Sequence, residues 1–378
     1  MYEIVPYGPA LKDQLIELQR HLWSDDLALN AAYFEWKYEL NPYFPKPLIQ
    51  LAVQGGRVVG MRGVFGSCWE AGPASESFRI PAADDLVIHP EHRSQGLFGS
   101  IMRATIDDLA ERGYPCAFTL SPGPATLAGS LTTGWKVVAS MRPVQRMTTT
   151  RGIVSHLRSR VGEIRLLWRY ADGVRRLEQS SSAARPFARL DREGRRARGV
   201  TRPRISVARA PRVEDMANLV RRLGHDGRLR HVRDEKYLAW RFRNPLHEYR
   251  FVFCDQERLE GYLVLQTYRR QPGWQFNIVD WEGTFAARAA LLRDVVMWGR
   301  LPDVRAWTAA LPDDTGPMLR EHAFVPVPTG EGPLARHLPS ILTRPIPGRA
   351  SRSEPTLGGR RVLDPAAWDM RMLYSMAG

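Results

Sequence analysis

The sequence predicts a mixed α/β fold in two lobes, each with a central, mostly antiparallel sheet flanked by helices. Three observations lead to this prediction. The chain has 378 residues, which is the length of about two domains. Segments with helical spacing of apolar residues alternate with short apolar runs typical of strands. An aromatic sequence followed by Asn-Pro occurs twice, once in each half of the chain.

In the first lobe, the elements are predicted from periodicity and from turn residues. Helical spacing predicts helices over residues 11–21, 31–40, 97–112 and 126–133, and apolar runs predict strands over 2–7, 79–89 and 116–120. Gly55-Gly56 favours a tight turn, so residues 49–54 and 58–65 should form a hairpin. The second helix should end before Pro42, because the residue before a proline disfavours the α conformation.

The second lobe is predicted from an internal repeat. Tyr33-Phe34-Glu35-Trp36-Lys37-Tyr38 before Asn41-Pro42 corresponds to Tyr237-Leu238-Ala239-Trp240-Arg241-Phe242 before Asn244-Pro245. A hairpin with a glycine, Gly60 or Gly261, follows each copy. A strand over 276–283 and a helix over 287–300 continue the second lobe. We interpret the chain as a tandem duplication; the alternative is two unrelated aromatic helix ends that happen to precede Asn-Pro.

The charge distribution divides the chain further. The net charge is +14, and residues 151–212 hold 17 arginines against five acidic residues, so +12 of it lies there. Apolar residues spaced by three and four over 153–177 predict a basic amphipathic helix, followed by a polar linker over 180–212. We therefore predict four parts: a domain over 1–150, the helix and linker over 151–212, a second domain over 213–330 and a tail over 331–378. Trp368, Met372 and Leu373 should anchor the tail on a core.

Composition excludes several classes of protein. With 25 % charged and 44 % hydrophobic residues, the chain is typical of globular proteins. It has no apolar run of about 18 residues that would span a membrane, and its first residues do not resemble a signal peptide. Cys68, Cys116 and Cys254 are too widely spaced for a disulfide scaffold or a structural zinc site. We expect a reduced, cytoplasmic protein without a bound metal.

The segment from Asp84 to Gly99 has the strongest functional signal. An apolar strand ends at Ile88-His89-Pro90, a polar loop follows, and a helix begins after Gly96. Backbone N–H groups of Gln95 to Gly99 would then lie at a helix N-terminus, which binds phosphate groups through these donors and the helix dipole. Gly96 permits a close approach of the backbone, and Arg93 and Ser94 add side-chain donors.

This segment resembles motif A of the GNAT superfamily of N-acyltransferases, in which a strand ending in V-x-P precedes R-x-x-G-x-G/A. The corresponding residues are Ile88-His89-Pro90 and Arg93-Ser94-Gln95-Gly96-Leu97-Phe98. The resemblance covers residues 1 to about 147 and includes the order of the flanking elements. It implies acetyl-CoA or another acyl-CoA as donor, with its pyrophosphate on Gln95 to Gly99 and its pantetheine beside Leu86, Val87 and Ile88. It also implies direct attack of a substrate amine on the thioester.

The resemblance places a carboxylate base on the motif strand. Asp85 is the favoured candidate, three residues before Ile88, and Asp84 is the second. We expect the two side chains to point to opposite faces of the sheet, because side chains alternate along a strand. A base that acts through water elsewhere in the site, or a purely structural role of both carboxylates, stays open.

Four features depart from the family pattern. Phe98 is bulky where a small residue is usual. Ser130 occupies the place of the tyrosine that often protonates the leaving thiolate. Ser121 stands where an asparagine often contacts pantetheine, so it is either a ligand or a simple turn residue. The second lobe, around Asp280-Trp281-Glu282, lacks the Arg-x-x-Gly loop and is predicted to be a degenerate copy that binds no CoA.

The charge distribution leaves several partners open. Three roles of the basic segment stay open. It could be a solvated linker with a packed helix, or it could contact an anionic membrane surface through residues 153–177. A contact with nucleic acid is the less favoured third role. The expected function is transfer of an acetyl or small acyl group to a primary amine of a small molecule or amino sugar. The alternatives are an aminoacyl-tRNA-dependent transferase, which would not need the pyrophosphate loop, and a non-catalytic binding protein.

Overall fold

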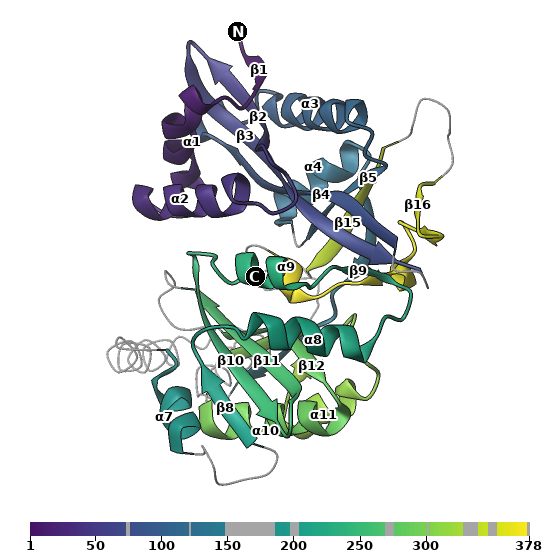
Figure 1. Cartoon of the computed structure of the whole chain (residues 1–378). Coiled ribbons are helices and arrows are strands. Elements are labelled where there is room, and N and C mark those ends of the chain that lie inside the picture. The colour runs from purple at the N-terminus through teal and green to yellow at the C-terminus, as the bar shows by residue number, and fades with distance from the viewer. Residues whose placement is uncertain are drawn as a thin grey trace, which may run out of the picture. The chain divides into compact units, whose positions relative to one another are not determined.

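The computed structural model describes residues 1–72, 76–120, 122–147, 186–196, 204–268, 276–299, 301, 303–327, 339–346 and 354–375. The chain forms two compact units, and each contains one main mixed sheet with helices (Figure 1). The first unit comprises Met1–Ser140, His225–Pro245 and Pro339–Met370; the second comprises Met141–Gly224, Leu246–Leu338 and Arg371–Gly378. The units are thus assembled from separate segments, unlike the continuous lobes expected from the sequence.

The main sheet of the first unit has the strand order β1-β2-β3-β4-β5-β15-β6. Its strands are β1 (Glu3–Pro6), β2 (Leu48–Gln54), β3 (Arg57–Ala71), β4 (Glu76–Ile88), β5 (Cys116–Leu120), β15 (Ser340–Pro345) and β6 (Lys136–Ser140). The helices are α1 (Lys12–Leu18), α2 (Leu27–Phe34), α3 (Leu97–Glu111), α4 (Pro124–Thr132) and α9 (Glu235–Arg241). Only the β4–β5 pair of this path is parallel.

Short elements complete the first unit. They are β9 (Leu229–His231), β16 (Thr356–Leu357), β17 (Arg360–Arg361), β18 (Trp368–Asp369), the 3-10 turns η1 (Pro9–Leu11), η2 (Gln19–His21), η4 (Pro90–His92) and η5 (Pro365–Ala367), and the π-turn η3 (Glu35–Glu39). β9 extends the main sheet by pairing with both β3 and β18. The segment around Trp368 is therefore part of the first unit.

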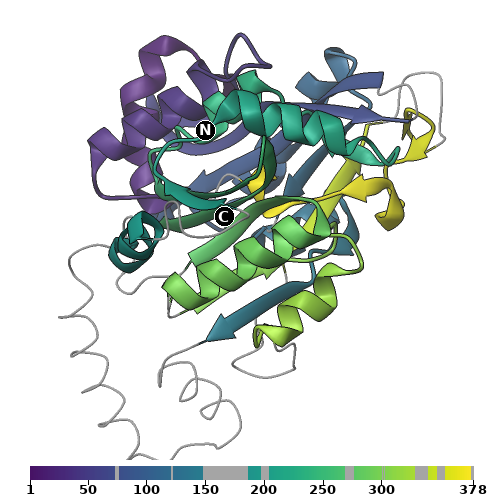
Figure 2. The same ribbon diagram turned by 60° about the horizontal axis from the view of Figure 1, so that its bottom comes forward.

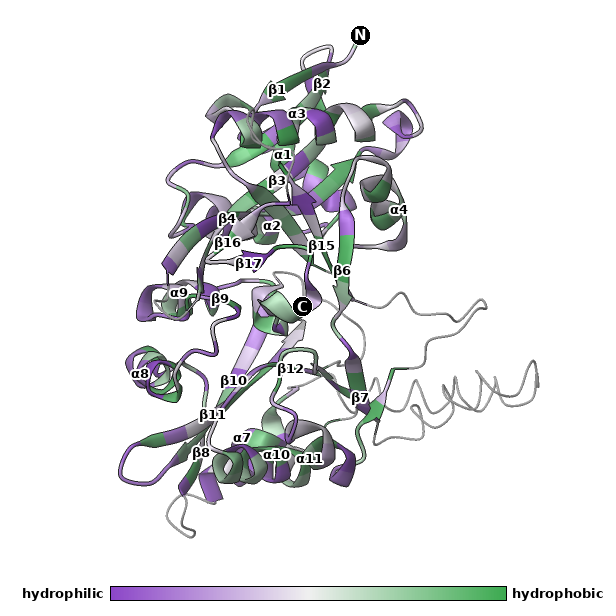
Figure 3. Cartoon of the chain, turned by 90° about the vertical axis from the view of Figure 1, so that its right-hand side faces the viewer, coloured by the Kyte–Doolittle hydropathy of each residue, from purple (hydrophilic) through white to green (hydrophobic). Residues whose placement is uncertain are grey.

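The helices of the first unit form because one face of each can be buried. α3 buries Leu97, Ile101, Met102 and Leu109, which recur at helical spacing, while residues such as Ser100, Arg103 and Asp107 are exposed. Figure 3 shows hydrophobic and hydrophilic residues side by side around this helix. In Figure 1, α1 and α2 lie on one face of the sheet, and α3 and α4 lie on the other. The loop before α3 is thereby fixed at the end of β4.

The main sheet of the second unit has the order β8-β10-β11-β12-β13-β7-β14. Figure 2 shows most of this unit in green, with its helices beside the sheet. Its strands are β8 (Arg204–Ala208), β10 (His247–Asp255), β11 (Leu259–Tyr268), β12 (Phe276–Gly283), β13 (Asp303–Trp307), β7 (Pro143–Met147) and β14 (Val325–Pro326). The helices are α7 (Ala188–Arg196), α8 (Val213–Leu223), α10 (Phe285–Gly299) and α11 (Thr315–Glu321), with the 3-10 turn η6 (Met372–Tyr374). One cluster of buried apolar side chains in its core includes Leu263, Leu265 and Leu291.

The two main sheets have the same order of corresponding strands, with one exchange. β15, which follows the second copy in sequence, lies between β5 and β6 of the first unit. β7, which follows the first copy, lies between β13 and β14 of the second unit. Each unit therefore receives one inner strand from the other half of the sequence. The common strand order confirms the predicted duplication.

The repeated aromatic segments meet inside the first unit. Trp36 of η3 and Trp240 of α9 stack with ring centroids 4.9 Å apart and planes inclined by 11°. Each indole N–H donates to the backbone carbonyl of the other tryptophan, at 2.7 and 2.8 Å. This reciprocal contact explains why the Tyr-x-x-Trp pattern is present in both copies.

Other parts of the chain differ from the sequence-based expectation. The segment interpreted as a linker over 180–212 contains α7 and the edge strand β8, which buries Ile205. The expected amphipathic helix over 153–177 lies outside the described residues. Trp368, Met372 and Leu373 are buried, as expected for anchors of the tail. Of the helices that the structure describes, none has the length and apolar composition needed to cross a bilayer.

Candidate functional site

The loop between β4 and α3 places a helix start beside a strand end. Ser94 and Gly96 have positive φ angles of 60° and 76°, and Gly96 caps α3 without any side-chain hydrogen bond. A Cβ atom built at Gly96 would meet no atom within 4 Å, so the space above this residue is open. The first N–H groups of α3 are thus free to bind an anion, with the positive end of the helix dipole behind them.

The motif residues differ in their exposure to solvent. Arg93, Ser94, Gln95 and Gly96 are exposed, and Leu97 is buried. The Arg93 Nε donates to the carbonyl of Ile88 at 3.1 Å, which holds the loop against the strand end. Phe98 and Gly99 are half-buried.

Phe98 does not obstruct the loop. Its ring packs over Gly129 of α4, where any side chain would overlap it. The bulky residue at this motif position is therefore accommodated by a glycine on the neighbouring helix. The sequence pattern alone does not reveal this pairing, because the two residues lie on different helices.

One edge of β4 is free near the loop. Among the described residues, the parallel pairing of β4 with β5 is limited to Ala82 and Phe118. Beyond this pair the strands separate, so Leu86, Val87 and Ile88 keep their pairing with β3 but have no strand on their other side. Such an edge can hydrogen-bond an extended ligand as an added strand would.

Asp84 and Asp85 lie at an irregularity of β4. Asp84 pairs with Gly63 of β3, and Leu86 pairs with the residue before Gly63, so Asp85 is an extra residue with a positive φ of 49°. The prediction that the two side chains point to opposite faces is wrong, because the bulge interrupts the alternation. Both carboxylates contact the ammonium of Lys37, Asp84 Oδ2 at 2.8 Å and Asp85 Oδ1 at 2.9 Å.

The two carboxylates differ in access to solvent. The side chain of Asp85 is fully buried, and its Oδ2 accepts a hydrogen bond from the Tyr38 hydroxyl at 2.7 Å. The side chain of Asp84 is 30 % exposed, and no described group donates a hydrogen bond to its Oδ1. Gly63 is required beneath this group, since a Cβ atom there would overlap the Tyr38 hydroxyl. Asp84 is thus the carboxylate that a molecule from solvent can reach.

Burial governs the ionisation of this cluster. Desolvation raises the pKa of Asp85, and the Lys37 ammonium partly opposes this effect. Burial also raises the pKa of Tyr38 well above its ordinary value, with the negative charges of Asp85 and Asp84 adding to the shift. The pKa of Arg62, a buried residue of β3, is lowered by desolvation, while the charge of Asp84 opposes the shift. The electrostatic coupling of these groups makes them one site.

The remaining candidates are placed as follows. Ser121 lies outside the described residues. Ser130 is fully buried in α4, and its hydroxyl is among the described polar atoms without a hydrogen-bond partner. His89, Glu91 and His92 bring possible ligand atoms within 4.8 Å of one another, a spacing that a metal ion could bridge. The expectation that the protein binds no metal stays a prediction.

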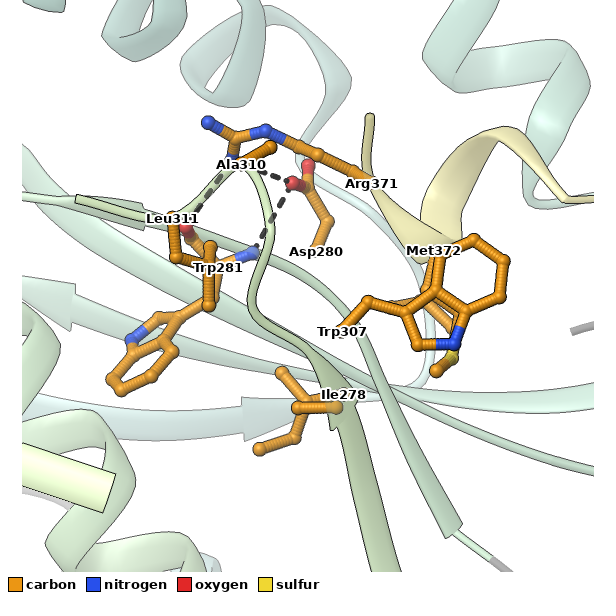
Figure 4. Close-up of a pocket in the computed structure, with 10 residues that line it drawn as sticks. Ile278, Asp280, Trp281, Trp307, Ala310, Leu311, Arg371 and Met372 are labelled. Atoms are coloured by element: carbon orange, nitrogen blue, oxygen red, sulfur yellow. Dashed lines mark hydrogen bonds and ion pairs between the residues drawn. The ribbon is translucent and has the colours of Figure 1, made fainter. Parts of the chain in front are cut away.

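In the second unit, Asp280 is the counterpart of Asp85. It accepts a hydrogen bond from Tyr262 at 2.7 Å and pairs with Arg371 at 3.3 Å. β12 and β13 pair in parallel up to Ile278 and then separate. Figure 4 shows Arg371 beside Asp280 and Met372 beside Trp307, so the C-terminal segment lies against the separated strands.

The connection into α10 also differs from that into α3. Gly283 ends β12, and only Thr284 separates it from α10, which begins at Phe285. The Thr284 hydroxyl accepts a hydrogen bond from the N–H of Ala287 at 3.3 Å. The start of α10 is therefore partly capped by its own chain, and there is no loop over it that could enclose a phosphate.

Lys37, like Arg62, is a charged residue of this cluster that was not predicted from the sequence. It lies 47 and 48 positions before the two aspartates, so no local pattern connects them. The repeat did contain a signal, because the corresponding position of the second copy is also basic. Lys37 and Arg241 are both fully buried, which is rare for basic residues without a specific role.

No family model and no curated protein matches this sequence. Several solved structures match the structure of this chain. One is a probable N-acyltransferase from Enterococcus faecalis V583, at a TM-score of 0.56 and 13 % identity, covering 92 % of this chain and 73 % of that one. A GCN5-related N-acetyltransferase from Anabaena variabilis matches at a TM-score of 0.54 and 12 % identity, with coverage of 92 % and 73 %.

A tandem GNAT protein from the clavulanic acid biosynthesis pathway matches over almost its whole length. Its TM-score is 0.52 at 11 % identity, with 92 % of this chain and 99 % of that chain covered. At such identities the likeness shows the fold, and both copies of the fold are included in the match.

Proposed function

We propose that this chain, which has the fold of the GCN5-related N-acetyltransferases in two copies, transfers an acetyl or other small acyl group from acyl-CoA to a primary amine. The observation that carries the proposal is the open start of α3 beside the free edge of β4. An acyl-CoA has an anionic diphosphate and an extended pantetheine, and these two features fit a phosphate-binding helix start and an unpaired strand edge.

The donor would be held mainly by the backbone. The N–H groups from Gln95 to Gly99 would bind the diphosphate, with Arg93 and Ser94 at the rim of the loop. Leu86, Val87 and Ile88 would present backbone groups to pantetheine. Because acyl-CoA supplies the thioester, the chain itself has to position the amine and accept its proton.

Asp84 is the residue best placed to accept the proton. Its side chain is 30 % exposed and no described group donates to its Oδ1, whereas both oxygens of Asp85 are occupied by buried partners. The amine nitrogen would form a bond to the acyl carbon as the C–S bond breaks, and the amine proton would pass to Asp84. The leaving thiolate would take a proton from solvent, because the hydroxyl of Ser130 is buried and a poor acid.

We propose a small-molecule amine or an amino sugar as acceptor and a cytoplasmic location. The neutral balance of Lys37, Arg62, Asp84 and Asp85 suits a small polar acceptor rather than a strongly acidic one. A contact of residues 153–177 with a membrane surface remains a separate proposal based on the sequence alone.

Calorimetric titration tests the donor site directly. We expect one-to-one binding of acetyl-CoA that weakens at higher salt, since part of the affinity comes from the diphosphate. S-acetylpantetheine, which lacks the diphosphate, is the matched ligand and should bind at least about 100-fold more weakly. Equal affinities for the two ligands would refute the assignment of the loop.

Thiol release tests the reaction. With acetyl-CoA present, the enzyme should release CoA in the presence of glucosamine, benzylamine or cadaverine and form the corresponding amide. Donor binding without any transfer would favour a non-catalytic binding protein. If the folded protein does not bind acetyl-CoA but binds RNA in a salt-sensitive way, an aminoacyl-tRNA-dependent transferase becomes the better hypothesis.

A further inference from the structure

Lys37 is a completely buried ammonium next to the only exposed carboxylate of the described site. Its Nζ donates to Asp84 at 2.8 Å, to Asp85 at 2.9 Å and to the hydroxyl of Tyr33 at 3.0 Å. An ammonium has three N–H donors, so each of them has an acceptor. This lysine cannot turn outward without leaving Asp85 buried and uncompensated.

Aromatic rings surround the same ammonium. Nζ lies 5.1–5.8 Å from the ring centroids of Trp23, Tyr33, Tyr38 and Phe65. The faces of aromatic rings attract cations, and the rings also exclude water. The carboxylates, the hydroxyl and the rings therefore all stabilise a positive charge at one fixed point.

That fixed charge is close to the proposed binding position of the acceptor. Asp84 uses Oδ2 for Lys37, no described group donates to its Oδ1, and its side chain is 30 % exposed, so an acceptor amine held by Asp84 becomes the second cation on one carboxylate. Two cations a few ångströms apart disfavour each other, and Lys37, unlike the acceptor, is held in place by three hydrogen-bond acceptors and surrounding aromatic rings.

We propose that Lys37 is a positioning residue whose fixed ammonium, acting through Asp84, favours the uncharged and nucleophilic form of the acceptor amine. This inference rests on the proposed acyltransferase function. It gives the buried lysine a role beyond holding the strand bulge together, because only a neutral amine has the lone pair that attacks a thioester.

The charges around Asp84 determine in which direction each substitution shifts the pKa of the bound acceptor amine. Besides Lys37, the groups facing this carboxylate are Asp85 of β4, Tyr38 of η3, Tyr33 of α2 and Arg62 of β3. Removing the positive Lys37 should stabilise the protonated acceptor. Removing the negative Asp85 should have the opposite effect.

The second copy of the repeat provides the conservative control. Arg241 stands at the position of Lys37, as judged from the alignment of Trp36 with Trp240, and it is fully buried. This fold therefore accepts an arginine at the corresponding place. Lys37→Arg keeps the positive charge and should preserve the function.

The experiment is the pH dependence of kcat, measured with saturating acetyl-CoA and with glucosamine, benzylamine and cadaverine as acceptors. The acid side of such a profile reports ionisation in the complete enzyme–substrate complex. In Lys37→Met we expect it to move up by about one pH unit. In Lys37→Arg it should stay in place, and in Asp85→Asn it should move to lower pH.

The outcomes separate the inference from the proposed function. A purely structural role of Lys37 would change rates or stability but leave the acid side at the same pH in all variants, and this result would overturn the inference alone. If Lys37→Met does not fold, Asp85→Asn decides, since an unchanged or upward-shifted profile refutes the inference. If the wild type acetylates none of the three amines, the proposed function fails and the inference fails with it.

Discussion

The two units differ most where a strand leads into a helix. In the first unit, eight residues separate the end of β4 at Ile88 from the start of α3, and the exposed Gly96 leaves the helix N-terminus uncapped by any side chain. In the second unit, only Thr284 separates β12 from α10, and its hydroxyl accepts a hydrogen bond from the helix start. The same sheet order thus supports an open helix start in one copy and a closed turn in the other.

A second difference concerns the carboxylate at the corresponding position of each sheet. Asp85 is neutralised by Lys37, which lies on the preceding helical segment of the same copy. Asp280 is neutralised by Arg371 from the C-terminal segment, which also contacts Glu282 at 2.6 Å. Both units thus have a buried aspartate at this position, but the basic residue that pairs with it comes from a different segment in each unit.

The largest expected effect is on stability. Lys37→Met leaves Asp85 buried without its cation, and we expect the free energy of unfolding of the first unit to fall by about 3–5 kcal/mol. Lys12→Met is the matched control, because the Lys12–Glu39 pair is about one-third exposed on both sides and contributes at most about 1 kcal/mol. Urea denaturation of both variants measures the difference. Similar losses of unfolding free energy would mean that the buried ion pair stabilises the protein no more than the surface pair does.

The next effect concerns the open helix start. Gly96→Glu places a carboxylate where the diphosphate is proposed to bind, and acetyl-CoA affinity should fall at least about 100-fold. Gly113→Glu is the control: Gly113 follows the other end of α3, also has a positive φ, and has open space around it. It should carry the same backbone strain without loss of affinity. If calorimetry finds equal acetyl-CoA affinities for Gly96→Glu and Gly113→Glu, the proposed role of the loop in diphosphate binding is contradicted.

A smaller effect tests the closed turn of the second unit. Thr284→Ala removes the acceptor for the Ala287 N–H and should lower the unfolding free energy by about 1 kcal/mol. Acetyl-CoA affinity should not change, since no donor site is proposed there. In Thr132→Ala, the lost hydroxyl donates only to the carbonyl of Gly129 in its own helix, so this exposed position serves as control. A change in donor affinity in Thr284→Ala would indicate that the second unit also binds CoA.

The last effect is a pH dependence. The pKa of Asp85 is raised by burial, so the native state holds this proton more tightly than the unfolded state does. The stability contributed by this group is present below the unfolded pKa of about 4 and is lost as the pH rises through the raised native pKa. The unfolding free energy of the wild type should therefore fall relative to Asp85→Asn as the pH rises above about 4. Parallel curves for the two proteins would show that Asp85 does not titrate differently on folding.

Local patterns were sufficient for the fold class and for the loop. Periodicity identified α3 and its strand, and Gly96 with its flanking residues indicated an open helix start after the strand, because all of these residues are adjacent in sequence. That this helix start binds an anion stays a prediction. The bulge at Asp85 was not predictable, since an extra residue in a strand has no distinctive side-chain pattern. Lys37 was missed for a related reason: its pairing depends on the way that η3 packs over β3 and β4.

The exchange of β7 and β15 was also beyond the sequence. Both strands are short, and nothing in their composition specifies which of two similar sheets they join. The division into continuous lobes followed from the order of the repeats. Strand pairing depends instead on tertiary contacts between residues about 200 positions apart, such as Ile341 with Leu120.

The exchanged strands have a consequence for synthesis of the protein. Residues 340–345 form an inner strand of the first unit, so its sheet stays incomplete until these residues, about 200 positions after β6, have left the ribosome. At a synthesis rate of about 5–20 residues per second, the N-terminal half waits many seconds with the edges of β5 and β6 unpaired. During this interval the unpaired edges of these strands can pair with other extended segments. The two copies must therefore mature together, and a gene cut between them would encode two halves that each lack an inner strand.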